Sequence, residues 1–217
     1  MLLIVAQHTN PQDISCGYYL EKIITRLSEN HEIILITEDR PKSLDENSKI
    51  EIIQVSTPKF FKDNLSFGFG FLHKVSISFL MLFQAIKKSQ EKEEILIGTN
   101  PFLIILLPLI LKIFFVKAKV NILLFDLFPE NLLATSNKAL VKIPLIFFKF
   151  LFNLSYRQAS KIFSIGRDMS KILEYKKVAR NKIIYTPNWC DDQFNFDEEK
   201  KKKALSSLNI NYDSNKN

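Results

Sequence analysis

Short runs of β-branched and apolar residues alternate with longer amphipathic segments along most of this 217-residue chain. The runs have the composition of buried strands, and they predict strands at 2–6, 33–37, 50–55, 95–98, 120–125, 161–165 and 182–186. The intervening segments carry apolar residues at helical spacing and predict helices at 18–30, 71–88, 138–157 and 167–175. Such alternation builds right-handed βαβ units. It therefore predicts an α/β fold, Rossmann-like and doubly wound, with a mostly parallel seven-stranded sheet.

Length and composition predict one folded domain. A chain of 217 residues with 47% hydrophobic and 24% charged residues can bury one sizeable core and differs from a disordered chain. Residues 197–217 are polar and begin with DEEKKKK, which predicts a linker with one short helix and a frayed tail. We therefore expect a Rossmann-like domain at 1–196 and a polar linker and tail at 197–217.

Two features of the sequence, its N-terminus and its cysteines, predict a cytoplasmic location. The N-terminus reads MLLIVAQH, without a basic n-region or a clear cleavage site for export. Cys16 and Cys190 belong to no CxxC pair and no cluster with the spacing of metal ligands. We expect reduced thiols, no bound metal and a cytoplasmic location.

Positive charge is concentrated in one part of the chain. Between residues 131 and 182 there are eleven Lys or Arg against two acidic residues, so this segment carries +9 where the whole chain carries +7. Such a patch suits anionic lipid, nucleic acid or a phosphorylated substrate. A solvated helix surface is the alternative interpretation.

Two apolar runs bear on membrane contact. The runs at 102–116 and 143–154 are shorter than the ~18 to 20 apolar residues that span a bilayer, so they predict buried crossover helices. The second run also places four phenylalanines beside lysines, which fits a helix lying in a membrane interface. These phenylalanines are Phe147, Phe148, Phe150 and Phe152.

The loops after the strands are where function is expected, because a parallel sheet binds ligands at the carboxyl ends of its strands. The loop after the first strand leads to Gly17 alone and lacks the GxGxxG pattern of dinucleotide-binding folds. The chain also lacks a phosphate-binding P-loop, a GxSxG elbow and an HExxH metal motif. His8, His31 and His73 show no partner pattern, and we expect no catalytic role for them.

Four segments at predicted strand ends share a pattern: 94–102 (EILIGTNPF), 120–130 (VNILLFDLFPE), 159–169 (ASKIFSIGRDM) and 182–194 (KIIYTPNWCDDQF). In order and spacing they resemble the N-terminal, acceptor-side domain of family 4 (GT4) glycosyltransferases, which is one half of a GT-B fold. The resemblance covers about residues 1 to 200. It is nearest to the branch that builds bacterial surface polysaccharides, where the second segment typically ends in DLWPE.

The resemblance implies transfer of a hexose from a nucleotide-sugar donor to a lipid-linked or saccharide acceptor in polysaccharide assembly. It also implies retention of anomeric configuration, with no cofactor and no metal. The family's N-terminal domain holds the acceptor, and a second domain holds most of the donor nucleotide. We expect that donor domain to be absent here and the isolated chain to be inactive unless the domain is supplied in cis or by a partner.

Two other functions remain open. A non-catalytic, membrane-associated subunit of a split transferase would keep the acceptor pocket without chemistry. Lipid-linked acceptors would give the basic, Phe-rich segment a function on an anionic surface at the inner face of the cytoplasmic membrane. A nucleic-acid-binding Rossmann domain is disfavoured, because no recognition motif is present, and no nucleic-acid partner is expected.

The resemblance also assigns site residues. Asp126 is the expected catalytic residue, since a carboxylate at a strand end can accept a hydrogen bond from a sugar hydroxyl and orient it. The alternative is a structural cap of the following turn. Glu130 is expected to contact the acceptor, or to sit at a helix N-terminus for its charge alone.

The remaining expected contacts to acceptor or donor are Gly17, Thr99, Asn100, Ser164 and Arg167. Gly17 would let the backbone approach a ligand, or would serve only a helix-starting turn. Thr99 and Asn100 would lie near a bound sugar, or cap the next helix. Ser164 and Arg167 would face the donor phosphates, although Arg167 also suits a solvated surface.

Overall fold

The computed structural model describes residues 1–10, 15–57, 67–90, 94–114, 117–135, 139–189 and 198–207. The chain divides into two compact units, Met1–Pro187 and Asn188–Asn217. The second unit contains helix α9 (Glu198–Ser207). The domain boundary expected at residue 196 falls outside the described residues.

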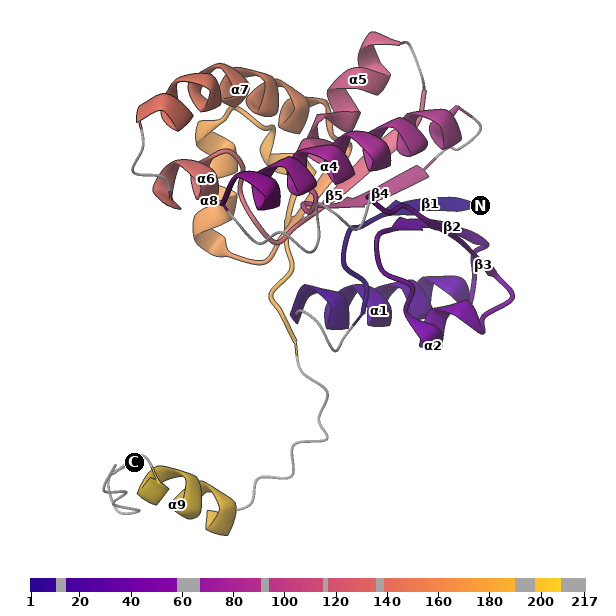
Figure 1. The fold of residues 1–217 in the computed structure, drawn as a ribbon, viewed down its shortest axis with the longest axis vertical. Coiled ribbons are helices and arrows are strands. Elements are labelled where there is room, and N and C mark those ends of the chain that lie inside the picture. Colours follow the sequence, from indigo (N-terminus) through magenta and orange to yellow (C-terminus); the bar gives the residue numbers. More distant parts are fainter. Residues whose placement is uncertain are drawn as a thin grey trace. The chain divides into compact units, whose positions relative to one another are not determined.

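All seven predicted strands are present and form one sheet (Figure 1). They are β1 (Leu2–Val5), β2 (Ile33–Thr37), β3 (Ile50–Gln54), β4 (Glu94–Gly98), β5 (Lys119–Leu124), β6 (Lys161–Ser164) and β7 (Ile183–Tyr185). Their order is β3-β2-β1-β4-β5-β6-β7, and each neighbouring pair is parallel. The predicted α/β, Rossmann-like, doubly wound fold is confirmed.

Helices cover both faces of the sheet (Figure 1). α1 (Ser15–Ser28) and α2 (Lys42–Asp45) pack on one face, where Leu20, Ile24 and Leu44 join a cluster with residues of β1 and β2. The other face carries α4 (Phe67–Ser89), the 3-10 turn η1 (Phe102–Leu106), α5 (Leu107–Ile113) and α7 (Ala139–Gln158). The shorter elements α6 (Glu130–Thr135), α8 (Arg167–Tyr175) and η2 (Arg180–Lys182) complete this unit.

The segment after β4 differs from the single helix considered for 102–116. It forms η1 and then α5, and Pro108 lies at the start of α5. Proline lacks a backbone N–H, so it is accommodated in a first turn and not in a helix interior. The chain therefore begins a new helix at this proline.

The core explains the aromatic content of α7. Phe152 and Tyr156 are fully buried, and Phe148 packs against the same cluster. Only Phe150 of the described phenylalanines on α7 is exposed. The interpretation of this Phe-rich run as a membrane-interface helix is therefore wrong for Phe148 and Phe152, because both rings pack in the core, and it stays a prediction for the exposed Phe150. The side chain of Phe147 lies outside the described residues.

The order of the strands determines where in the sheet a ligand-binding site is expected. β1 lies between β2 and β4, so the chain leaves β1 toward one side of the sheet and returns to β4 on the other. The loops after these two strands therefore diverge, and ligands of doubly wound sheets bind in the crevice they leave. None of the helices in the described ranges is long and apolar enough to cross a membrane.

Candidate functional site

A small open pocket lies at this divergence of β1 and β4. Its cavity volume is about 10 Å³, and it is lined by Gln7, His8, Cys16, Leu20, Gly98, Thr99, Asn100 and Phe125. The backbone N–H of Gln7 donates to the carbonyl of Asn100 at 2.9 Å, which fixes the two loops together. Of the residues expected from the sequence, Thr99 and Asn100 line the pocket.

Thr99 joins the loops after β4 and β5. Its side chain is fully buried, and its Oγ1 accepts hydrogen bonds from the backbone N–H of Phe125 at 3.3 Å and of Asp126 at 3.1 Å. The residue before η1 is Pro101, so Thr99 does not cap that turn. Its hydroxyl instead holds Asp126 beside the pocket-lining loop.

Asp126 has partners on both carboxylate oxygens. Asn100 Nδ2 donates to Oδ2 at 3.4 Å, and Asn131 Nδ2 donates to Oδ1 at 3.1 Å. The carboxylate is half-buried, and these amides restrict its rotation. Each oxygen keeps a further lone pair, so the carboxylate can still accept a hydrogen bond from a ligand hydroxyl.

Glu130 begins α6 and forms an ion pair that the sequence did not indicate. Its Oε1 lies 2.7 Å from Nζ of Lys176 and 3.8 Å from Nζ of Lys149. Lys176 also donates to Oδ1 of Asn153 at 2.6 Å. Within the described part of the chain, Oε2 of Glu130 is buried and has no hydrogen-bond partner.

Lys176 is a buried ammonium at the end of α8. Burial lowers its pKa, while the hydrogen bond and the charge of Glu130 act in the opposite direction. Its Nζ also lies 5.7 Å from the centre of the Tyr156 ring. The phenol of Tyr156 accepts the N–H of Phe128 at 3.2 Å, and burial raises its pKa. This cluster fixes the loop between Asp126 and Glu130.

Gly17 is the third residue of α1 and lies against the preceding loop. A Cβ built on it would overlap the backbone carbonyl of Asn10. Gly17 is therefore needed for close packing of the loop on the helix, while its neighbour Cys16 is the residue that lines the pocket.

Ser164 and Arg167 follow β6, the strand next to β5. Ser164 is fully buried, and its Oγ donates to the carbonyl of Gly166 at 2.9 Å. Arg167 is exposed, with its guanidinium 5.4 Å from the centre of the Tyr185 ring. The hydroxyl of Ser164 thus shapes the turn, and Arg167 is the group that solvent reaches.

His8 is a pocket residue that sequence reasoning missed. Its Nδ1 lies 3.2 Å from Oδ2 of Asp39, in the loop after the neighbouring strand β2. A carboxylate on one ring nitrogen orients the imidazole and fixes which nitrogen carries the proton. The expectation that His8 has no partner is therefore wrong, because the partner is 31 residues away and only the parallel pairing of β1 and β2 brings it close.

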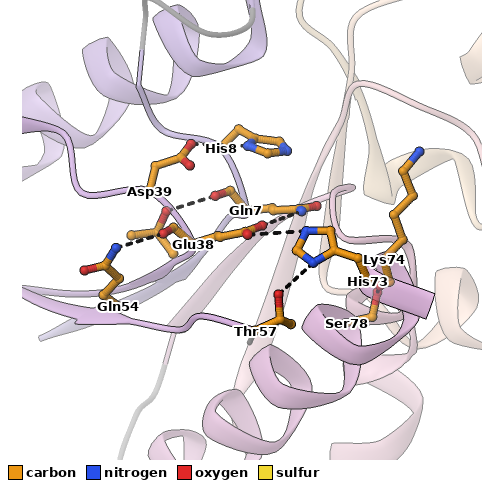
Figure 2. A network of polar contacts seen from close by, with 10 residues as sticks. Gln7, His8, Glu38, Asp39, Gln54, Thr57, His73, Lys74 and Ser78 are labelled. Atoms are coloured by element: carbon orange, nitrogen blue, oxygen red, sulfur yellow. Dashed lines mark hydrogen bonds and ion pairs between the residues drawn. The ribbon is translucent and has the colours of Figure 1, made fainter. Parts of the chain in front are cut away.

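Next to this pair lies a buried network centred on Glu38 (Figure 2). Its Oε2 accepts from Nε2 of Gln7 at 2.8 Å, and its Oε1 is 3.4 Å from Nε2 of His73. Nδ1 of His73 is 2.7 Å from the hydroxyl of Thr57. The expectation that His73 has no partner is also wrong. The network links the ends of β1, β2 and β3 to α4 and so stabilises the loop that carries His8.

Within the described ranges, no group of three or more His, Cys, Asp and Glu side chains could hold a metal ion. The site is instead a set of amides, hydroxyls and carboxylates around His8, Thr99, Asn100 and Asp126. Hydrogen-bonding groups of this kind at the crevice of a parallel sheet suit a polar ligand with several hydroxyls.

The sheet, its helices and this crevice define an α/β Rossmann-like domain of the kind found in GT-B glycosyltransferases. No family model matches the chain. The chain is 26% identical over 195 residues to "Probable glycosyltransferase WbjE" of Pseudomonas aeruginosa, a match that covers 87% of this chain and 47% of that protein. The chain spans about half the length of the curated relative it matches.

Solved structures share the fold at low identity. Anabaena Alr3699/HepE, crystallised in complex with UDP, has a TM-score of 0.53 and 12% identity, over 96% of this chain and 50% of that chain. A glycosyltransferase from Rickettsia africae ESF-5 has a TM-score of 0.50 and 14% identity, over 98% and 50%. The N-terminal domain of Candida albicans trehalose-6-phosphate phosphatase has a TM-score of 0.56 and 15% identity, over 95% and 55%.

Proposed function

We propose that this chain is the acceptor-binding half of a glycosyltransferase of family 4, acting in the assembly of a cell-surface polysaccharide. The observation that carries the proposal is the small pocket at the divergence of β1 and β4, lined in part by the polar side chains of His8 and Asn100, in a chain similar to WbjE over 87% of its length. The fold alone would not support a function, because many unrelated activities share it.

The proposed reaction transfers a hexose from a nucleotide-sugar donor to a lipid-linked or saccharide acceptor, with retention and without a metal. A bond forms between an acceptor oxygen and the anomeric carbon, and the bond from that carbon to the donor diphosphate breaks. The proton of the acceptor hydroxyl passes to an oxygen of the departing diphosphate. The donor nucleotide would be held by a second domain, in the same protein or in a partner, with the exposed Arg167 nearest to its phosphates and Ser164 shaping the turn that carries Arg167.

Asp126 is the proposed catalytic residue. Its carboxylate, oriented by Asn100 and Asn131, accepts a hydrogen bond from the reacting hydroxyl and fixes its direction. His8, oriented by Asp39, lines the pocket and is a second polar contact to the acceptor. Thr99 acts through the backbone of Asp126 and is a positioning residue.

Calorimetry on the purified chain tests the proposal. We expect soluble polyprenyl-diphosphate acceptor analogues or short saccharides to bind, and we expect Asp126→Asn to weaken that binding by about tenfold, as for loss of one charged hydrogen bond. Asp45→Asn is the matched control, because Asp45 is an exposed aspartate on α2 whose side chain pairs with Arg40.

Three outcomes are informative. Acceptor binding that Asp126→Asn weakens and Asp45→Asn does not supports the proposed pocket. Acceptor binding without transfer, when a donor domain is supplied, favours the non-catalytic subunit. Binding of oligonucleotides with a steep salt dependence, and of no acceptor, would overturn the proposal.

A further inference from the structure

Helix α4 presents an apolar stripe to solvent. Phe79 and Phe83 lie on this 23-residue helix and are 59% and 65% exposed, although large aromatic rings are usually buried. Leu72 and Leu80 are exposed on the same helix. Phe79, Leu80 and Phe83 follow Leu72 by seven, eight and eleven positions. This spacing places all four side chains on one face of a helix with 3.6 residues per turn. The opposite face of α4 packs into the core through Ile77, Met81 and Ala85.

The end of α5 adds to this exposed apolar area. Ile113 and Phe114 are 60% and 67% exposed, and α5 packs against α4 on the same side of the sheet (Figure 1). On the opposite side, α1 and α2 contribute no exposed large hydrophobic side chain among the described residues. We name this area the α4–α5 surface; its residues are Leu72, Phe79, Leu80, Phe83, Ile113 and Phe114.

Helices α4, α5 and α7 carry charge of one sign, and acidic partners of their lysines come from other elements: Glu51 pairs with Lys88, and Glu130 pairs with Lys149. The 23, 7 and 20 residues of α4, α5 and α7 contain no Asp or Glu. Exposed cations border the apolar stripe at Lys87 on α4 and Lys112 on α5. The other side differs, because α1 contains Glu21 and α2 contains Asp45.

We propose that the α4–α5 surface docks on an anionic lipid bilayer. Exposed aromatic and aliphatic side chains enter the boundary between headgroups and acyl chains, while the bordering lysines contact lipid phosphates. A protein partner or a second copy of this chain would need acidic groups to match the lysines, and this surface offers none to a copy of itself. Both the apolar stripe and the single sign of charge match a bilayer that contains anionic lipid.

This inference deepens one part of the proposed function, the location at the inner face of the cytoplasmic membrane. It assigns membrane contact to α4 and α5, and α7 contributes its core-facing rings to the fold instead. This inference rests on the proposed function in one respect only, since the proposed function gives the reason why the protein would bind a membrane. Vesicle binding is measured without donor or acceptor, so a failure of the membrane proposal can be told apart from a failure of the proposed function.

Co-sedimentation of the full chain with vesicles tests the surface. We compare vesicles of phosphatidylcholine with vesicles that also contain phosphatidylglycerol. The chain is expected to bind the anionic vesicles, and the double variant Phe79→Ser/Phe83→Ser is expected to lose about tenfold or more in partition, from the apolar area kept in water. Lys87→Glu is expected to lose about fivefold or more on anionic vesicles, and the parent chain to bind less at high salt.

The matched control is Tyr175→Ser on α8, since Tyr175 is 85% exposed and lies outside the α4–α5 surface. It should bind as the parent chain does. All substituted side chains are exposed, and circular dichroism checks that the variants fold. Equal binding by the Phe79→Ser/Phe83→Ser variant and the parent would overturn the proposal. So would a concentration-dependent dimer that the same double variant abolishes while vesicle binding stays absent.

Discussion

Gly17 is a residue whose requirement follows from space and not from backbone conformation. Replacing it with alanine adds a methyl group that overlaps the carbonyl of Asn10, a backbone atom that cannot rotate away. Alanine in a helix gains about 1 kcal/mol over glycine, and overpacking costs about 1–3 kcal/mol, so the overlap is expected to prevail. We expect Gly17→Ala to lower the free energy of unfolding by about 1–2 kcal/mol in urea titration.

Gly98→Ala is the comparison for that variant. Its added methyl would lie 3.6 Å from Cβ of Ala6, an ordinary contact distance. We expect its midpoint of unfolding to stay near that of the parent chain. A Gly17→Ala variant as stable as Gly98→Ala would show that the loop before α1 moves aside without cost.

His8 and Asp39 give a second expected outcome at the residue scale. Hydrogen bonding of Nδ1–H to the Asp39 carboxylate favours the tautomer with the proton on Nδ1. We expect Asp39→Ala to shift the ring nitrogen resonances of His8 in long-range ¹H–¹⁵N spectra, measured at a pH where the imidazole is neutral. The exposed ring of His31 is the internal control, and unchanged His8 resonances would exclude the pairing in solution.

The sequence predicted some of the site residues and missed their partners for a physical reason. Thr99, Asn100 and Asp126 follow two neighbouring strands, so the parallel order alone brings them together. The pairs of His8 with Asp39 and of Glu130 with Lys176 join loops that are 31 and 46 residues apart. Such pairs depend on loop conformation and side-chain packing, which residue patterns do not encode locally.

At the scale of elements, the ion pair of Glu130 and Lys176 connects the start of α6 with the end of α8. Removing the buried ammonium leaves the Glu130 carboxylate without its close partner, so we expect Lys176→Met to cost about 1–3 kcal/mol in the free energy of unfolding. The double variant with Glu130→Gln should recover part of that loss, because no buried charge is then left unpaired. Additive losses in this double-mutant cycle, measured in urea, would show that the two groups do not interact.

Stability near Lys176 should also depend on pH. Its pKa in the folded chain is lower than the ordinary lysine value of 10.5 because of burial. Between the two pKa values the unfolded chain binds more protons, so the contribution of Lys176 makes the folded state more stable as pH rises through that window. We expect the difference in unfolding free energy between the parent chain and Lys176→Met to increase with pH there. A difference that is flat across alkaline pH would contradict the lowered pKa.

All seven strands and the longer helices were predicted from their residue patterns. The helix at 167–175 was predicted with both its ends, and the strands were predicted to within one residue at each end. α2 and α6 were missed because their 4 and 6 residues are too short for a helical period to repeat. The break between η1 and α5 was missed because a proline inside an apolar run starts a new helix as readily as it ends one.

At the scale of the whole molecule, the sheet order follows from the alternation of elements and the handedness of βαβ crossovers, which the sequence carries throughout. The asymmetry of the two helical layers did not follow in the same way. The Phe-rich runs at 71–88 and 139–157 look alike in sequence, yet their exposure differs: Phe79 and Phe83 both face solvent, whereas Phe150 alone of the described phenylalanines on α7 does and Phe152 faces the core. Which side of an apolar helix is covered depends on its neighbours, so the α4–α5 surface required the fold.

The two compact units lead to a last expected outcome. Both clusters of buried hydrophobic side chains, as far as the described residues define them, lie within Met1–Pro187. Because cooperative unfolding depends on a shared buried core, a chain ending at Pro187 should still unfold in one transition. Its urea dependence should remain that of a protein of its size, since the slope scales with the surface exposed on unfolding. Loss of cooperativity, measured as transitions that differ between circular dichroism and intrinsic tyrosine fluorescence, would mean that residues after Pro187 complete the core.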